Sequence, residues 1–575
     1  MIINSFQALK KNLKKDFTGL KKIKIAVLGD TATQLYVQGF RGFGYENGFD
    51  FEIFEAEYNQ IERQTLDPTS EFYSFAPEFV IIFYSAIKLQ EKFAMLSPRE
   101  RELLAEKQLA EMEKICDSVF ERLSCKIILF NFQESIDPVF GNYANKTAFS
   151  FLYQIRKLNL GIMHLAQRYK NLFVNDLNAL QAQYGAGFIA QRNIYINTDV
   201  LFSLDFLPIV IKNTADIIFA VAGKFNKCLI LDLDNTIWGG VIGDDGIENI
   251  QIGHFGIGKA YTELQLWIKQ LKQRGIILAV CSKNDESIAK EPFLKHPDMI
   301  LKLEDIAVFV ANWSNKADNI RHIQNVLNIG FDSMVFLDDN AFERNQVITE
   351  IPQLCVPELP GDPAEYLPYL QKLNLFETAS FTEEDELRTK QYQEEAKRSV
   401  EYKQFANEED FLQSLQMSAE VQTFTDFNIP RVAQLTQRSN QFNLRTIRYT
   451  EDEIKNIASD ANYIPFAFTL KDKFGDYGLI SVIILKKHAS EVLIDTWIMS
   501  CRVLKRGMEL FVLNAIAEVA KEAGASYLKG EYIPTLKNGL VKDHYANLGF
   551  VKNEAYWELD LKNFENKKCF ITREK

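Results

Sequence analysis

Cysteine and histidine are scarce in this chain, and neither forms a ligand pattern. The 575 residues include 7 Cys and 6 His. The cysteines are dispersed, odd in number and without a CxxC pair, which argues against a disulfide framework and a zinc site. No stretch of roughly 18 or more apolar residues occurs, and the N-terminus lacks the apolar core of a signal peptide. We therefore expect a cytoplasmic chain with reduced thiols and no transmembrane segment.

An excess of basic charge is also missing. The 65 Lys and Arg are outnumbered by 77 Asp and Glu, for a formal net charge of −12. This balance disfavours wholesale binding to nucleic acid or to anionic membranes. The apolar share of 47% and the charged share of 25% are ordinary for globular proteins. At about 100–200 residues per domain, the length predicts three or four domains.

The first segment has the spacing of an amphipathic helix. Apolar residues recur every three or four positions between Ile2 and Leu20, with Lys10, Lys11, Lys14 and Lys15 between them. Such a helix either docks on the domain that follows or lies on a membrane surface. We favour docking.

Strand-like and helix-like segments alternate over the first two thirds of the chain, which predicts parallel sheets. A first series of short apolar runs occupies residues 23–28, 79–84, 126–131 and 171–174. A second series occupies residues 228–231, 276–280, 299–301 and 334–337. We therefore expect two α/β domains, spanning residues 1–222 and 223–375.

The last third of the chain reads differently. A proline-rich breaker at 356–363 precedes a charged helical stretch at 382–415, interpreted as a linker with a bridging helix. Apolar runs that suit antiparallel strands follow, and then a helix over residues 507–523. We expect a third domain of α+β type over residues 376–575.

The apolar run at 229–231 ends in two acids and a hydroxyl, Asp232, Asp234 and Thr236. The period of two residues in a strand places both acids on one side of its carboxyl end, where open α/β sheets bind ligands. Two adjacent carboxylates repel each other, so a divalent cation is the natural partner, and oxygen ligands favour Mg²⁺. Ordinary solvated acids at a turn are the alternative.

Three later segments make that alternative much weaker. Ser282 ends a second apolar run, Lys316 precedes a helix, and Asp338 and Asp339 end a further run. In this order the four motifs resemble the haloacid dehalogenase (HAD) superfamily of aspartate-nucleophile phosphotransferases. The resemblance implies a phosphatase or phosphotransferase with a Rossmann-like core.

The resemblance also implies residue roles. Asp232 would attack phosphorus to form an aspartyl-phosphate, and Asp234 would protonate the leaving group and then deprotonate water. Ser282 would bind the phosphoryl oxygens, and Lys316 would offset negative charge in the transition state. The implied Mg²⁺ site comprises Asp232, Asp234, Asp338 and Asp339.

The spacing of these motifs limits the size of any cap over the site. Only 49 residues separate Asp232 from Ser282, and 33 separate Ser282 from Lys316. Neither interval holds a separate cap domain, so we expect a minimal cap. The site would be open to a bulky partner or covered by the other domains.

Flanking segments resemble the FkbH-like branch of this superfamily. They are Trp238–Gly240, Cys281–Asp285, Asp338–Arg344, Val356–Pro360, Gln434–Asn443 and Met499–Gly507. That branch implies dephosphorylation of a phosphorylated three-carbon acid, a glyceryl donor, and transfer of the acyl group to an acyl carrier protein. Two alternatives stay open: a plain phosphomonoesterase in polysaccharide biosynthesis, and a carrier-binding assembly protein.

If acyl transfer occurs, Cys281 is the first candidate thiol and Cys501 the second, although a buried cysteine is more often a small core residue.

The loop before the last long helix resembles the signature of GNAT-type acyltransferases. It contains Arg502, Lys505, Arg506 and Gly507. Backbone N–H groups at such a helix start cradle the pyrophosphate of CoA or of phosphopantetheine. Lys505 stands where the signature usually has its first glycine. A GNAT-like domain that only docks a carrier is the alternative.

The first domain resembles SGNH hydrolases at its opening strand, residues 25–31, with Thr31 at the nucleophile position. No histidine lies in the closing segment, residues 185–215, and a hydroxyl without a base is a poor nucleophile. We therefore expect a flavodoxin-like or SGNH-like domain that is not catalytic.

Overall fold

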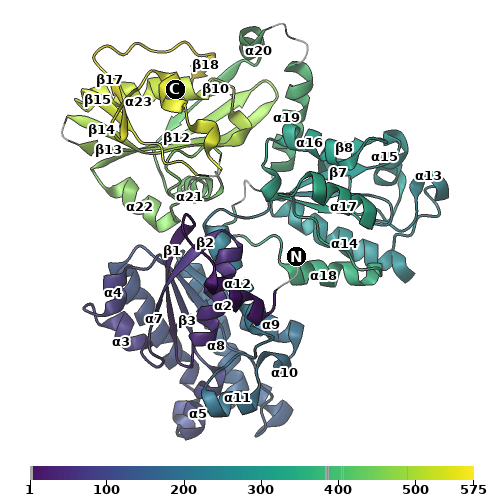
Figure 1. Cartoon of the computed structure of the whole chain (residues 1–575), viewed down its shortest axis with the longest axis vertical. Helices are drawn as coiled ribbons and strands as arrows, with labels where there is room; N and C mark the ends of the chain where they lie inside the picture. The colour runs from purple at the N-terminus through teal and green to yellow at the C-terminus, as the bar shows by residue number, and fades with distance from the viewer. Residues whose placement is uncertain are drawn as a thin grey trace. The chain divides into compact units, whose positions relative to one another are not determined.

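A computed structural model of the chain describes residues 4–382, 385, 388–402, 405, 407–439, 441–488, 490–535 and 537–574. The chain divides into two units, Ile2–Phe219 and Ala220–Lys575 (Figure 1). The predicted end of the first domain at residue 222 lies close to this division. The predicted boundary at 375/376 falls inside the second unit and stays a prediction.

The first unit contains a five-stranded parallel sheet in the order β2-β1-β3-β4-β5. The strands are β1 (Lys21–Gly29), β2 (Phe49–Glu55), β3 (Phe79–Phe83), β4 (Lys126–Phe130) and β5 (Leu172–Asn175). This is the flavodoxin-like strand order. Strand β2 lies outside the predicted apolar runs. Its apolar and acidic residues alternate, which is typical of a strand with one exposed face: Phe51 is buried, whereas Glu52 and Glu55 are partly or fully exposed.

Helices fill the crossovers of this sheet. The longer ones are α2 (Gln34–Glu46), α7 (Leu104–Arg122), α8 (Phe151–Arg168) and α12 (Leu207–Val221). The shorter ones are α3 (Ile61–Leu66), α4 (Glu71–Phe75), α5 (Ala86–Met95), α6 (Pro98–Arg101), α9 (Leu177–Tyr184), α10 (Ala186–Ile189) and α11 (Arg192–Thr198).

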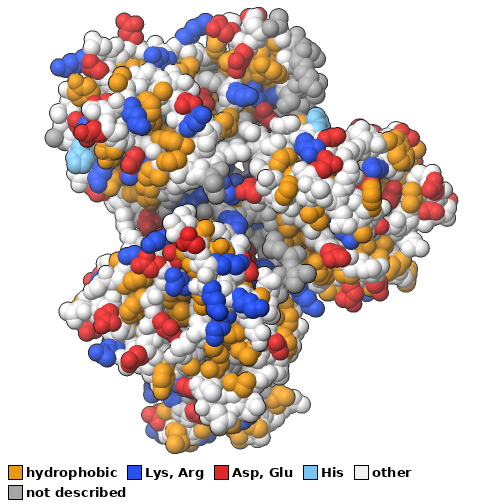
Figure 2. Space-filling model, viewed as in Figure 1, with side chains coloured by type: hydrophobic (Ala, Val, Ile, Leu, Met, Phe, Trp, Pro, Cys, Tyr) orange, Lys and Arg blue, Asp and Glu red, His pale blue; other side chains and the backbone are white. Residues whose placement is uncertain are grey.

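The N-terminal segment docks on α2, as expected. Helix α1 (Phe6–Lys11) buries Phe6 and Leu9, and Asn12 Nδ2 donates to the Gly42 carbonyl at 3.1 Å. Gly42 permits this approach, because a Cβ there would lie 2.0 Å from the Leu9 oxygen. The helix is shorter than predicted, and Ile2 lies outside the described residues. Figure 2 shows Lys and Arg side chains gathered on the visible face of this unit.

The second unit begins with a four-stranded parallel sheet in the order β8-β7-β6-β9. The strands are β6 (Cys228–Leu231), β7 (Ile277–Ser282), β8 (Ile306–Ala311) and β9 (Met334–Leu337). The helices are α13 (Ile242–Asp245), α14 (Gly256–Gln273), α15 (Glu286–Lys295), α16 (Lys316–Leu327), α17 (Ala341–Glu350) and α18 (Tyr366–Leu373). Successive residues of β6 enter separate apolar clusters on the two sheet faces. This double burial explains why the strand is an unbroken apolar run.

One predicted strand of this sheet is wrong. Residues 299–301 are not a strand, and β8 lies a few residues later. The Gln265 side-chain oxygen accepts hydrogen bonds from the backbone N–H groups of Ile300 and Leu301, at 3.0 and 3.2 Å. A side chain on α14 thus takes the donors that a neighbouring strand would otherwise have paired.

The remainder of the second unit contains a nine-stranded mixed sheet in the order β16-β17-β15-β14-β13-β12-β10-β18, with β11 paired to β12. The strands are β10 (Met417–Ala419), β11 (Val421–Gln422), β12 (Tyr463–Asp472), β13 (Gly475–His488), β14 (Glu491–Met499), β15 (Tyr527–Gly530), β16 (Val551–Asn553), β17 (Tyr556–Asp560) and β18 (Ile571–Arg573). The helices are α21 (Ile429–Arg438), α22 (Glu451–Ser459), α23 (Met508–Glu522) and α24 (His544–Leu548). The expected α+β character is confirmed.

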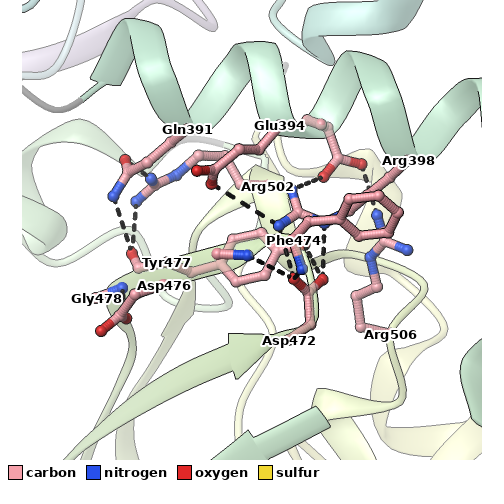
Figure 3. Close-up of polar contacts among 12 residues, drawn as sticks. Gln391, Glu394, Arg398, Asp472, Phe474, Asp476, Tyr477, Gly478, Arg502 and Arg506 are labelled. Atoms are coloured by element: carbon pink, nitrogen blue, oxygen red, sulfur yellow. Dashed lines mark hydrogen bonds and ion pairs between the residues drawn. The ribbon is translucent and has the colours of Figure 1, made fainter. Parts of the chain in front are cut away.

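The predicted bridging helix is two helices, α19 (Arg388–Tyr402) and α20 (Glu408–Ser414). Helix α19 contacts β8 and α16 on one side and β13 on the other. Its Arg398 is held by both oxygens of Asp472, at 2.7 and 2.8 Å, and stacks on Tyr477 (Figure 3). Helix α19 therefore joins the parallel sheet to the mixed sheet within the second unit. Among the described residues, none of the helices has the length and apolar character needed to cross a membrane.

Candidate active site

The candidate site lies where the four parallel strands of the second unit end. Asp232 follows β6, Ser282 ends β7, Lys316 begins the helix after β8, and Asp338 follows β9. Parallel strands bring their carboxyl ends to one edge of the sheet, so residues up to 106 positions apart in the sequence meet there. The four predicted motifs therefore lie together at one edge of the sheet.

Three carboxylates form the centre of this site. One ligand oxygen each from Asp232, Asp338 and Asp339 can lie within 4.8 Å of one another. Lys316 Nζ lies 3.0 Å from Asp232 Oδ1 and 2.6 Å from Asp338 Oδ2, and its side chain is only 4% exposed. Three acids and one cation carry a net charge of −2 when ionised, which fits a divalent cation with oxygen ligands.

Burial shifts the proton affinities of this cluster. It raises the pKa of Asp232 to about 7, although the Lys316 ammonium acts in the opposite direction. Burial and the Asp338 charge also raise the pKa of Asp339. For Lys316, burial alone would lower the pKa, but the two carboxylates outweigh it and the net shift is upward. Lys316 therefore stays a cation and pairs directly with the carboxylates of Asp232 and Asp338.

Asp234 lies apart from the carboxylate cluster. Its Oδ1 accepts from Trp238 Nε1 at 2.9 Å and from the Ile242 backbone N at 3.0 Å, and its Oδ2 accepts from Asn284 Nδ2 at 3.1 Å. The Asp234 carboxylate thus has its own hydrogen-bond donors, and it does not belong to the group formed by Asp232, Asp338 and Asp339. Three donors orient the group beside Asp232, which suits a proton-transfer role better than a metal-ligand role.

Several supporting residues were not predicted as functional groups. The Asp339 backbone N donates to Thr236 Oγ1 at 3.2 Å, and Arg344 Nη1 donates to the carbonyls of Asp338 and Asp339 at 2.9 and 2.6 Å. Asn284 holds Asp234, as described above. All three lie in segments that resemble the FkbH-like branch or the DxDxT motif, so the signal was present without an assigned role.

Cys281 and Ser282 are the last two residues of β7. Both are buried, at 1% and 0% exposure. The Cys281 thiol donates weakly to the Lys316 carbonyl at 3.7 Å, and burial raises its pKa above the ordinary value. An inaccessible thiol with a raised pKa is a poor nucleophile. This environment favours the core interpretation of Cys281, whereas the Cys501 side chain lies outside the described part of the structure.

The loop before α23 does not present its cations together. Arg502 is buried beside Gln391, Ser500 and the Tyr477 carbonyl. Arg506 is also buried and pairs with Glu395 at 2.6 Å. Lys505 is exposed with φ +62°, and Gly507 starts the helix with φ +74°. Arg506 is therefore committed to helix α19, and Lys505 is the exposed cation of the four predicted residues.

In the first unit, Thr31 is buried with 0% exposure, and its hydroxyl has no hydrogen-bond partner among the residues that the structure describes. The neighbouring Asp30 accepts from the Ser85 backbone N at 2.9 Å. Burial raises the pKa of Asp30 to about 6, although Ser85 and Lys88 act in the opposite direction. Among the described residues no base contacts this hydroxyl, and an unactivated hydroxyl is a poor nucleophile, which favours the non-catalytic interpretation.

Comparison with known proteins finds a family model and solved structures that are similar to parts of this chain. The family model described as "FkbH, N-terminal domain" matches residues 24–219. A crystal structure of the N-terminal part of a Bacteroides fragilis protein, containing a phosphatase domain and complexed with Mg, is 55% identical. It covers 66% of this chain and 100% of that chain, with a TM-score of 0.64. No curated protein matches the chain.

A GNAT-family N-acetyltransferase from Escherichia coli, solved in complex with CoA, is 13% identical. It covers 25% of this chain and 82% of that chain, with a TM-score of 0.19. That score is too low to assign the third domain a ligand or an activity. The Bacteroides relative and the N-terminal family model rest on far stronger similarity. On that similarity, this chain belongs to the FkbH-like proteins of the HAD superfamily.

Proposed function

We propose that this chain is a Mg²⁺-dependent phosphatase of the aspartate-nucleophile type. The main support for this proposal is the cluster of Asp232, Asp338 and Asp339 around Lys316, at the C-terminal ends of the parallel strands. The 55% identical relative contains a phosphatase domain and was solved with Mg, which supports the same chemistry here.

In this mechanism Asp232 attacks the phosphorus atom of a phosphomonoester, and the bond from phosphorus to the ester oxygen breaks. Asp234 gives a proton to the leaving oxygen and later takes one from the water that attacks the aspartyl-phosphate. Inorganic phosphate leaves and the Asp232 carboxylate is restored. Lys316, held against Asp232, offsets the negative charge of nucleophile and phosphoryl group.

Asp232, Asp338 and Asp339 are the residues that would hold Mg²⁺. When bound, the cation supplies further neutralisation of the phosphoryl oxygens. Asp234, oriented by Trp238, Ile242 and Asn284, remains available for proton transfer.

We further propose, from the FkbH-like resemblance, that the substrate is a phosphorylated three-carbon acid and that its acyl group passes to an acyl carrier protein. A free carboxylate does not form a thioester without activation, so the donor has to be an activated acyl group such as an acyl phosphate. Cys281 is too deeply buried to be our choice for an intermediate thiol. Direct transfer to the carrier thiol is the simpler route: the carrier thiolate attacks the acyl carbon, the bond from that carbon to the phosphate oxygen breaks, and inorganic phosphate leaves. In this route Asp232 does not attack phosphorus and would serve only to help hold Mg²⁺.

Phosphate release with and without divalent cation tests the first proposal. Asp232→Asn should abolish release, while Asp318→Asn, an exposed acid paired with Arg321 on α16, should not change it. Release that persists within tenfold in Asp232→Asn, or that ignores EDTA, would contradict the proposal.

Mass spectrometry of an acyl carrier protein tests the second proposal. Incubated with this chain and an acyl phosphate of a three-carbon acid, the carrier should gain the acyl mass only when Asp232 is intact. Phosphate release without carrier acylation would leave a plain phosphomonoesterase, which is the runner-up function.

A further inference from the structure

An ion pair outside the four motifs lies at the same edge of the parallel sheet as the carboxylate cluster. Lys283 Nζ donates to Glu343 Oε1 at 2.6 Å. Lys283 is the first residue after β7, and Glu343 lies in the first turn of α17, the helix that follows β9. The mechanism described above gives neither side chain a role.

This pair spans the end of the strand that carries the proposed nucleophile. In the sheet order β8-β7-β6-β9, strand β6 lies between β7 and β9. An ion pair between the loop after β7 and the helix after β9 therefore crosses the carboxyl end of β6, which Asp232 follows. Burial raises the pKa of the Cys281 thiol, and the Glu343 carboxylate adds to this rise together with two acids of the cluster. Glu343 is thus close enough to share the electrostatic environment of the cluster.

Lys283 is much more accessible than the groups that would act on phosphorus. Its side chain is 34% exposed, whereas those of Lys316 and Asp232 are 4% and 7% exposed. A phosphomonoester with its phosphorus atom at Asp232 has the strands of the sheet behind it, so its organic part extends toward solvent. Lys283 therefore lies where the organic part of the substrate meets the protein, rather than at the transferred phosphoryl group.

Glu343 holds this lysine in place. The Glu343 side chain is 10% exposed, and its Oε2 is buried without a hydrogen-bond partner among the residues that the structure describes. An ammonium group has three N–H donors, and Glu343 takes one of them. A lysine stem is flexible, so a fixed ammonium loses less entropy when it binds a ligand. The ammonium can bridge two carboxylates, one from Glu343 and one from a ligand, because each uses a separate donor.

We propose that Lys283 determines the specificity of the phosphatase site by binding an anionic group on the organic part of the substrate, and that Glu343 positions Lys283. This inference rests on the proposed phosphatase function and adds the residue that distinguishes phosphorylated acids from neutral phosphomonoesters. Hydrogen bonds to charged groups contribute enough free energy for a preference of about tenfold to a hundredfold.

Steady-state kinetics of phosphate release by the full chain in MgCl2 test the proposal. 3-Phosphoglycerate and glycerol 1-phosphate form a matched pair of substrates, because a carboxylate in the first replaces a hydroxymethyl group in the second. We expect kcat/KM of the natural protein to be at least about tenfold higher for 3-phosphoglycerate. Lys283→Met should lose this preference, mainly through a higher KM for 3-phosphoglycerate, and should keep kcat/KM for glycerol 1-phosphate within about twofold.

Three further variants complete the test. Lys283→Met combined with Glu343→Gln should lose the same preference, and it leaves no buried carboxylate without its cation if the single variant folds poorly. Glu343→Ala should raise KM for 3-phosphoglycerate alone, and Glu343→Gln, which keeps an acceptor for Lys283, should restore part of the preference. Lys295→Met is the control, because Lys295 pairs with Glu291 at 2.9 Å on the exposed side of α15 and should retain the full preference. Circular dichroism verifies the fold of each variant.

The possible failures of this test are distinct. Equal kcat/KM for the two substrates in the natural protein would overturn the specificity role of Lys283. Equal losses for both substrates in Lys283→Met would also overturn it, because the lysine would then contact the phosphoryl group that both share. No phosphate release from either substrate by the natural protein would instead overturn the phosphatase function on which the inference rests.

Discussion

Replacing Lys316 with methionine removes the positive charge of the carboxylate cluster but keeps most of the side-chain volume. The ammonium lies 3.0 Å from Asp232 and 2.6 Å from Asp338. At about 3 Å and an effective dielectric constant of about 20, each attraction amounts to about 5 kcal/mol. Removing the ammonium from water offsets several kcal/mol of this gain. We therefore expect the metal-free variant to lose about 3–5 kcal/mol of stability.

Hydrogen exchange of peptides that contain β6 and β9 measures this loss locally, which matters because a multidomain chain does not unfold in one step. In EDTA the predicted loss corresponds to roughly a hundred- to several-thousand-fold faster exchange. Added MgCl2 should restore more protection to Lys316→Met than to the natural protein. The variant's three carboxylates repel one another without compensation, so a cation that binds the folded state stabilises it more.

Lys290→Met provides the matched control. Lys290 pairs with Glu286 one turn away on α15, where the Glu286 side chain is 53% exposed, and we expect a change below about 0.5 kcal/mol. If β6 exchanged less than threefold faster in Lys316→Met in EDTA, Lys316 would not be the counter-charge of the cluster. The assignment of its role in phosphoryl transfer would then lose its electrostatic basis.

Three further predictions concern other parts of the chain. Asn284→Ala removes a donor to Asp234, so kcat for phosphate release should fall about tenfold or more with little change in KM; an unchanged kcat would contradict a positioning role. Gly42→Ala should speed hydrogen exchange in α1, because the new Cβ meets the Leu9 carbonyl, and should leave phosphate release unchanged; an unaffected α1 would contradict the docking interpretation. The raised pKa of Asp30, about 6 against an ordinary 3.8, means that its contribution to stability is complete below pH 3.8 and is lost as pH rises through 6. Asp30→Asn should remove up to about 3 kcal/mol of that pH dependence, measured by exchange in β1 and β3, and an unaltered pH profile would show that Asp30 is not the group responsible.

The carboxylate cluster was predictable because its residues follow apolar runs of strand length. A strand buried on both faces leaves a continuous apolar signature, and the first polar residues after it lie at the sheet edge. The sequence pattern therefore placed Asp232 and Asp338 at the ends of strands, and the HAD resemblance implied that they share a metal site. Where local signals compete, the same reasoning fails. Residues 299–301 have the composition of a strand, but the side chain of Gln265 takes their backbone donors, and no local pattern reveals a partner 35 positions away.

The sequence by itself determined the class of the second domain, the order of its motifs and the acids that meet at one edge, because those features depend on local periodicity and strand direction. Only the tertiary structure decided which acids share a centre and which charged side chains pair with one another. Asp234 accepts a hydrogen bond from Trp238, Arg506 pairs with Glu395, and Arg502 is buried beside Ser500 and the Tyr477 carbonyl. The physical reason is that charge partners are chosen by distance in the folded chain. Because histidine and cysteine are few and basic residues are not in excess, the sequence argued against zinc, disulfide and nucleic-acid sites. The net charge of a chain, however, does not show where cations gather in the folded protein.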